Sequence, residues 1–110
     1  MGQTNQSTQS LALTLPKSLL SVAPKFSLGM TVKTHGANQL LSSAEVNYYL
    51  HRYVRGDWGN TAEGDHEMND LAIEDGDRIL ATYDTPYGQQ IWIITEWDRS
   101  VTTVLLPDEY

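Results

Sequence analysis

RILATY (78–83), QIWIIT (90–95) and VTTVLL (101–106) are the three apolar stretches that decide the fold of this chain. Each is short and rich in apolar and β-branched residues, which is typical of a β-strand. The stretches DTPYG (84–88) and EWDRS (96–100) between them are polar and suit turns. Connections this short join antiparallel strands, because a parallel crossover needs roughly a dozen residues or more. We therefore predict an antiparallel meander with QIWIIT at its centre, since that stretch is apolar on both faces.

Before the meander, the chain carries one more strand pattern and two helix patterns. Residues 26–34 (FSLGMTVKT) alternate apolar and polar side chains, which predicts a first strand, and residues 37–41 suit a helical turn. A helix is expected after Ser42, which forms a capping box with Glu45, and Gly56 ends it. A second, largely exposed helix is expected over residues 62–75, capped by Asn60 or Thr61. Its thin apolar stripe consists of Met68, Leu71 and Ala72, with Ile73 as a further candidate.

These patterns predict an α+β fold in which two helices pack on an antiparallel β-meander of three to four strands. A length of 110 residues leaves room for one domain, which we place at residues 26–110. Residues 1–25 lack a secretion signal and begin with a polar, uncharged stretch, so we expect a flexible N-terminal arm on a cytoplasmic protein. The alternative is that Leu19, Leu20 and Val22 dock on the domain. One face of the sheet needs a cover, which this arm or a second copy of the chain, in a homo-oligomer, would supply.

Composition excludes several functional classes. The chain has no Cys, which excludes disulfides, thiolate zinc sites and a cysteine nucleophile. No run of about 18 apolar residues is present, so no membrane span is expected. Glycine-rich loops that would hold a nucleotide are also missing, and we expect no cofactor.

Charge is distributed unevenly along the sequence. Up to Gly56 there are five basic residues and one acid, whereas from Asp57 onward there are two basic residues and thirteen acids. An acidic half repels a phosphate backbone, so direct nucleic-acid binding is not expected. The same half suits a basic protein partner, including a protein that normally holds nucleic acid. The alternative is a solvated acidic surface that keeps a small domain soluble.

The tryptophans next to turn residues are the best candidates for binding a protein partner. Trp58 lies between Gly56 and Gly59, and Trp97 lies in the turn of residues 96–100. An exposed tryptophan is a frequent anchor of protein interfaces. Each could instead fold back as a lid on the core. We therefore predict a binding surface formed by Trp58, Trp97, Asp57, Asp98 and Arg99.

Catalytic and metal-binding candidates are weaker. Arg78 and Arg99 are the two cations of the acidic half. In a ribonuclease they would stabilise phosphoryl charge, with Glu63 or Glu96 as base. The alternative for Arg99 is an ion-paired turn. Glu63, His66 and Asp70 have spacings of three and four residues, which would place three ligands on one helical face. An exposed acidic helix produces the same spacing by chance, so no metal is the main expectation.

The chain resembles a family of small uncharacterised bacterial proteins that are often plasmid- or phage-associated. The resemblance rests on GDWG (56–59), Asn69 and residues 76–80, and on a C-terminal motif with WIITE (92–96), DRS (98–100), TTVLLP (102–107) and Tyr110. The resemblance implies no particular activity. The acid excess and the lack of a cofactor motif favour an accessory protein without catalytic activity, and the association with mobile elements suggests that it modulates a host nucleic-acid-handling or defence system. The order of helices before a meander is also similar to barnase-like ribonucleases, which implies the alternative of a small metal-independent ribonuclease or toxin-like enzyme. The loop at residues 96–100 lacks the histidine of that family.

Overall fold

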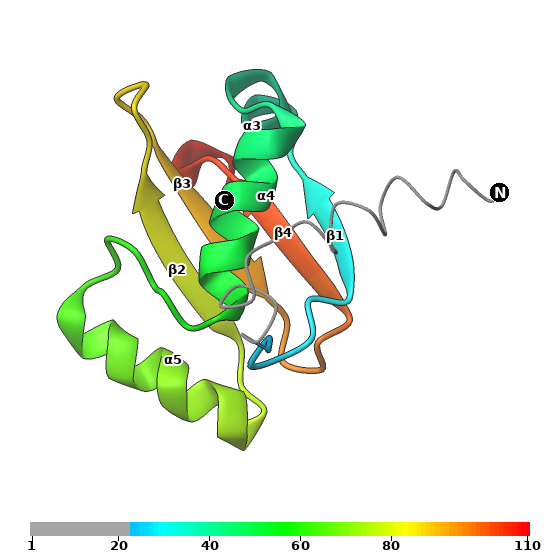
Figure 1. Ribbon diagram of the computed structural model, residues 1–110, viewed down its shortest axis with the longest axis vertical. Helices are drawn as coiled ribbons and strands as arrows, with labels where there is room; N and C mark the ends of the chain where they lie inside the picture. The colour runs from blue at the N-terminus through cyan, green and yellow to red at the C-terminus, as the bar shows by residue number, and fades with distance from the viewer. Residues whose placement is uncertain (1–22) are drawn as a thin grey trace, which may run out of the picture.

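The computed structural model describes residues 23–110, which form an α+β fold with a four-stranded sheet (Figure 1). Residues 1–22 of the predicted arm lie outside the described residues. In residues 23–110, no helix has the length and apolar composition needed to cross a membrane. The elements follow in the order β1 (Met30–Lys33), α3 (His35–Leu40), α4 (Ser43–Val54), α5 (Glu63–Asp75), β2 (Ile79–Asp84), β3 (Gln90–Thr95), β4 (Val101–Leu105) and the 3-10 turn η1 (Pro107–Glu109).

The meander is confirmed, but the whole sheet is mixed. Strand β2 pairs antiparallel with β3 and β3 with β4, so the QIWIIT strand is central, as predicted. Strand β1 instead pairs parallel with β4, giving the order β1-β4-β3-β2. The expectation of a purely antiparallel sheet is therefore wrong at β1. Three helices and two strands separate β1 from β4, a connection long enough for parallel pairing.

Strand β1 is shorter than the predicted strand of residues 26–34. Gly29 has a φ of +63°, which breaks the extended conformation before Met30. A Cβ at Gly29 would lie 2.3 Å from the carbonyl oxygen of Arg99, so only glycine permits this close approach. Phe26 and Leu28 still pack against the core, whereas the side chains of Met30 and Val32 are exposed.

Helix α4 lies on one face of the sheet and forms the core with it (Figure 1). Both halves of the predicted capping box between Ser42 and Glu45 are present. The Tyr53 hydroxyl lies 2.7 Å from Thr95 Oγ1, which lies 2.7 Å from Thr102 Oγ1. Because the Thr102 hydroxyl donates to the carbonyl oxygen of Leu28, Thr95 donates to Thr102. The Tyr53 hydroxyl also lies 3.3 Å from the carbonyl oxygen of Ile79. This buried series of hydroxyls fixes the segment before β1 to the sheet.

Helix α5 is placed by polar side chains at the outer edge of β2. Asn69 is buried; its amide nitrogen donates to the carbonyl of Leu80 at 2.8 Å and its oxygen accepts from the Leu80 N–H at 3.3 Å. The largely exposed helix was predicted, but its cap was not, and its apolar stripe was predicted only in part. Ala62 is the N-cap, because Asn60 and Thr61 accept instead from the N–H groups of Asp84 and Thr82. Ala72 is buried and Ile73 packs against the core, whereas Met68 and Leu71 face solvent.

Candidate functional site

Trp58 belongs to the core and is not part of a partner-facing surface. Its side chain is 2% exposed and lies edge-on to Tyr53, with ring centroids 5.6 Å apart. Its Nε1–H donates to Asp70 at 2.9 Å. The chain around Gly59 forms a β-bridge with Thr82, which turns the indole inward. The structure thus has the lid that was the alternative to a surface anchor.

Asp57 is engaged within the molecule as well. Its carboxylate accepts from Arg52 Nε at 2.8 Å and from the Gly59 N–H at 3.1 Å. The hydrogen bond from Arg52 holds the pKa of Asp57 below its ordinary value. The guanidinium of Arg52 also lies over the Tyr83 ring. These contacts give Asp57 a structural role at the end of α4.

Arg99 joins the turn of residues 96–100 to the C-terminal end of α5. Nη2 donates to the carbonyl of Ala72 at 2.8 Å, and Nη1 donates to the carbonyl of Asp77 at 2.6 Å. Nη1 also reaches the carbonyls of Glu96 and Trp97, both at 3.2 Å. A guanidinium bound to four carbonyls near a helix C-terminus is a cap for that helix. Arg99 therefore positions the turn rather than presenting a free cation.

Trp97 is the exposed aromatic residue of this turn. Its side chain is 67% exposed. The Arg99 guanidinium donates both to its carbonyl and to the carbonyl of Ala72 in the last turn of α5. Asp98 closes the turn by accepting from the Ser100 N–H at 3.1 Å, and hydrogen bonding to Ser100 lowers the pKa of Asp98. The predicted binding residues Trp97, Asp98 and Arg99 thus stay together, with only Trp97 free to contact a partner through an apolar side chain.

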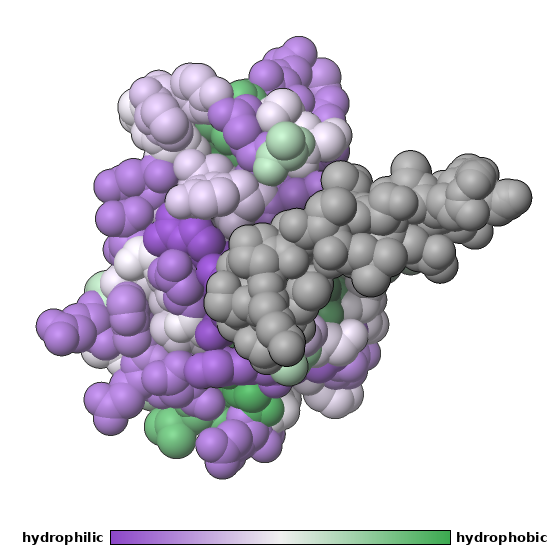
Figure 2. All heavy atoms as spheres, in the orientation of Figure 1, coloured by the Kyte–Doolittle hydropathy of each residue, from purple (hydrophilic) through white to green (hydrophobic). Residues whose placement is uncertain are grey.

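Helix α5 presents carboxylates and two apolar side chains to solvent. Met68 and Leu71 are 63% and 53% exposed, and the helix has six acidic residues without a Lys or Arg. None of these carboxylates forms a salt bridge within residues 23–110. Figure 2 shows apolar green atoms among purple hydrophilic ones along the lower edge of the molecule, over α5. We call the following residues the α5–Trp97 surface: Glu67, Met68, Leu71, Glu74, Asp75, Trp97 and Asp98.

Arg78 and Arg99 lie on opposite faces of the sheet. Arg78 donates to the Tyr110 hydroxyl at 3.1 Å and lies 3.9 Å from a carboxylate oxygen of Glu96. The Tyr110 ring packs on Trp92, whose side chain alternates with those of Ile91 and Ile93 and so points away from α4. Arg99 lies over the Phe26 ring, on the α4 side. The candidate catalytic residues Arg78, Arg99 and Glu96 therefore do not form one cleft.

Two of the three candidate metal ligands, His66 and Asp70, are engaged by other partners. His66 Nε2 lies 2.7 Å from the carbonyl oxygen of Thr61, and Asp70 accepts from Trp58. Among the residues that the structure describes, no group of three histidine, aspartate or glutamate side chains is placed to hold a metal ion. His66 and Asp70 thus fasten α5 to the loop that precedes it, whereas Glu63 is exposed.

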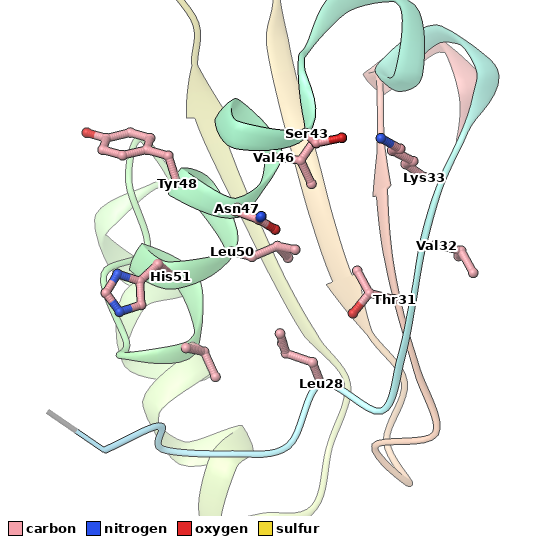
Figure 3. A pocket seen from close by; sticks show the side chains of 11 residues that line it. Leu28, Thr31, Val32, Lys33, Ser43, Val46, Asn47, Tyr48, Leu50 and His51 are labelled. Atoms are coloured by element: carbon pink, nitrogen blue, oxygen red, sulfur yellow. The ribbon is translucent and has the colours of Figure 1, made fainter. Parts of the chain in front are cut away.

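A groove between α4 and β1 is a feature that the sequence analysis missed. Its volume is about 780 Å³, within the range of binding sites, which is roughly 300–1,000 Å³. Figure 3 shows Leu28, Thr31, Val46 and Leu50 pointing into the space between the helix and the strand, whereas Val32 points away. The sequence does carry a signal for this groove. Four residues that line it are three or four positions apart and so form a stripe along α4: Ser43, Asn47, Leu50 and Val54.

Comparisons of the chain with protein-family models, curated proteins and solved structures found no match. The candidate sites therefore rest on the geometry above.

Proposed function

We propose that this protein acts by binding a basic protein partner through the α5–Trp97 surface. The observation that carries the proposal is the exposure of Met68 and Leu71 among carboxylates that have no cation partner in the described chain. Partner helices are often recognised through a few apolar side chains at spacings of three and four residues. Met68 and Leu71 have this spacing, and Trp97 adds an exposed anchor close to the end of the helix.

The charge of the surface indicates the chemistry of the partner. A helix with six carboxylates and no Lys or Arg is attracted to clustered Lys and Arg side chains, such as those that bind a phosphate backbone. The resemblance to plasmid- and phage-associated proteins supports a cytoplasmic partner from a host nucleic-acid-handling or defence system. The protein would then be an accessory protein that modulates its partner without catalysis of its own.

The ribonuclease alternative has less support. A ribonuclease needs charge stabilisation and a base on the same phosphate. Arg99 is bound to four carbonyls, and Arg78 contacts Tyr110 on the other face of the sheet. No histidine lies in the turn of residues 96–100.

Affinity capture from nuclease-treated lysate of the source cells, with the full-length tagged protein, tests the proposal. The test variant is Met68→Ser with Leu71→Ser, and a second variant is Glu67→Gln with Glu74→Gln. Met30→Ser and Asp108→Asn are matched controls, because Met30 is equally exposed and Asp108 carries the same charge away from α5. We expect one stoichiometric partner that the controls retain and that the Met68–Leu71 variant binds about tenfold or more weakly.

Competition distinguishes the partner class. Heparin or duplex DNA should displace the captured partner, and binding should weaken as salt rises. A partner retained equally by every variant would contradict the assignment of the surface. Degradation of RNA by the wild type that Arg78→Ala abolishes would favour the enzyme instead.

A further inference from the structure

The groove between α4 and β1 borders an open sheet edge. In residues 23–110, β1 pairs only with β4, and all four of its residues are exposed. The N–H groups of Met30 and Thr34 donate to Ser100 and Val104 on the β4 side. Because backbone groups alternate along a strand, those of Thr31 and Lys33 point to the opposite, open side. An unpaired edge of this kind is a template for one more strand.

The side chains at this edge define what a further strand must supply. Thr31 pairs in register with Thr102, a buried residue on the α4 face of the sheet, so its side chain points into the groove. A residue that exchanges hydrogen bonds with Thr31 in an antiparallel pair places its side chain on the same face. The added strand therefore needs apolar side chains at every second position, opposite Val46 and Leu50.

Residues 11–16 of the same chain, LALTLP, have this pattern. Leu11, Leu13 and Leu15 fall on one face of a strand, and Ala12 and Thr14 fall on the other. Pro16 ends such a strand because it lacks the N–H that pairing requires. We propose that Leu11–Leu15 adds to the free edge of β1 as an antiparallel fifth strand, with its leucines in the groove against α4.

Connectivity fits the antiparallel direction. The N–H of Lys25 donates to the carbonyl of Val54 at 2.8 Å, so the described chain starts beside the C-terminal end of α4. Val54, the last residue of α4, lines the groove together with Leu28. Figure 3 shows Leu28 at the end of the groove where the chain enters β1. An antiparallel strand would end with Leu15 at this place. Residues 16–22 then bridge to Ala23, and seven residues span up to about 23 Å.

Disulfide trapping in the full-length protein tests this arrangement, since the chain has no cysteine of its own. Thr31→Cys is combined in turn with Leu11→Cys, Leu13→Cys or Leu15→Cys. A hydrogen-bonded antiparallel pair has Cα atoms about 5.5 Å apart, which suits a disulfide. The controls combine Thr31→Cys with Ala12→Cys or Thr14→Cys, whose side chains would point away. We expect one leucine position to form an intramolecular disulfide at least about tenfold faster than both controls. In an unordered arm, neighbouring positions would have nearly the same effective concentration near Thr31, and all five cysteines would react at similar rates.

Two outcomes would overturn the proposal. Equal trapping rates at all five positions would mean that the segment does not pair with β1. Disulfide-linked dimers that increase with protein concentration would assign the groove to a second copy of the chain. Hydrogen exchange gives a cysteine-free test: the amides of Thr31 and Lys33 should exchange at least about tenfold faster when Leu11, Leu13 and Leu15 are all replaced by Ser. Unchanged exchange in that variant would equally contradict the fifth strand.

Discussion

Arg99 combines a strained backbone with a fully used side chain. Its φ of 60° is in the left-handed region, which costs a residue with a Cβ about 1–2 kcal/mol. The hydrogen bonds from its guanidinium to Ala72, Asp77, Glu96 and Trp97 offset that cost. The sequence suggested three roles for Arg99. The decisive contacts are with the carbonyls of Ala72, in the last turn of α5, and Asp77, just after the helix, and both are distant in the sequence. No local pattern contains that information.

Replacement of Arg99 by Lys should destabilise the protein markedly. An ammonium is a compact donor group and cannot reach the carbonyls that the two guanidinium nitrogens contact. We expect a loss of about 1.5–3 kcal/mol in the free energy of unfolding, measured by urea denaturation. Arg78→Lys is the control, and it should change stability by less than about 0.5 kcal/mol because Arg78 is exposed. Equal effects of the two substitutions would refute the capping role of Arg99.

Glu109 connects the C-terminal turn to the start of α3. Its carboxylate accepts from the Thr34 hydroxyl and from the N–H groups of Gly36 and Leu106. Hydrogen bonding, chiefly from Thr34, holds the pKa of Glu109 below its ordinary value of 4.5. A lowered pKa in the folded state means that the ionised carboxylate stabilises the fold. This stabilisation is complete above the ordinary pKa and disappears as the pH falls through the lowered one.

The Glu109→Gln variant should therefore lose stability at neutral pH and have a flatter acid dependence than the wild type. The difference between the two proteins should stay constant at neutral pH and shrink as the pH is lowered past 4.5. Urea midpoints between neutral pH and about pH 3 measure it. Asp108→Asn makes the same charge change on the neighbouring residue and should show a smaller difference. A wild-type advantage that grew on acidification would refute the linkage.

At the scale of elements, features that depend on neighbouring residues were predicted from the sequence, and features that depend on long-range pairing were not. The meander and α4 were predictable because each depends on neighbouring residues: short polar turns, apolar runs and the Ser42 capping box. The parallel pairing of β1 with β4 joins Met30 to Val101, a contact that no periodicity encodes. The cap of α5 was mispredicted for a similar reason. Asn60 and Thr61 are ordinary capping residues, but β2 offers them N–H groups that only the folded chain brings near.

Asn69 shows how α5 depends on one polar residue. The Asn69→Ala variant leaves the N–H and carbonyl of Leu80 without their partner at the edge of β2. We expect a loss of about 1–3 kcal/mol, measured as a lower urea midpoint. Asn38→Ala, at an exposed position of α3, is the matched control and should stay within about 0.5 kcal/mol of the wild type. Equal stability of the two variants would show that the hydrogen bonds between Asn69 and Leu80 do not hold α5 against β2.

At the scale of the whole molecule, the concentration of acidic residues on α5 lowers the stability of the helix but favours the binding of a basic partner. Three pairs of like charges lie at spacings of three or four residues on α5: Glu63 with Glu67, Glu67 with Asp70, and Asp70 with Glu74. Each such pair destabilises a helix by about 0.2–0.5 kcal/mol. Glu63 lies in the first turn, where negative charge is favourable to the helix dipole, but Glu67 lies beyond it. The repulsion at Glu67 is thus uncompensated within the described chain.

The Glu67→Gln variant should consequently be more stable than the wild type in low salt. It removes two of the three repulsive pairs, which predicts a gain of about 0.4–1 kcal/mol, or several degrees in Tm. The gain should vanish near about 1 M NaCl, where the screening length falls to about 3 Å. The Glu63→Gln variant should gain little stability. It relieves the repulsion with Glu67, but it also loses the favourable interaction of a negative charge with the helix dipole. If Glu67→Gln also weakens partner capture, the repulsion on α5 is retained for binding, whereas unchanged capture would separate the charge of α5 from the proposed interface.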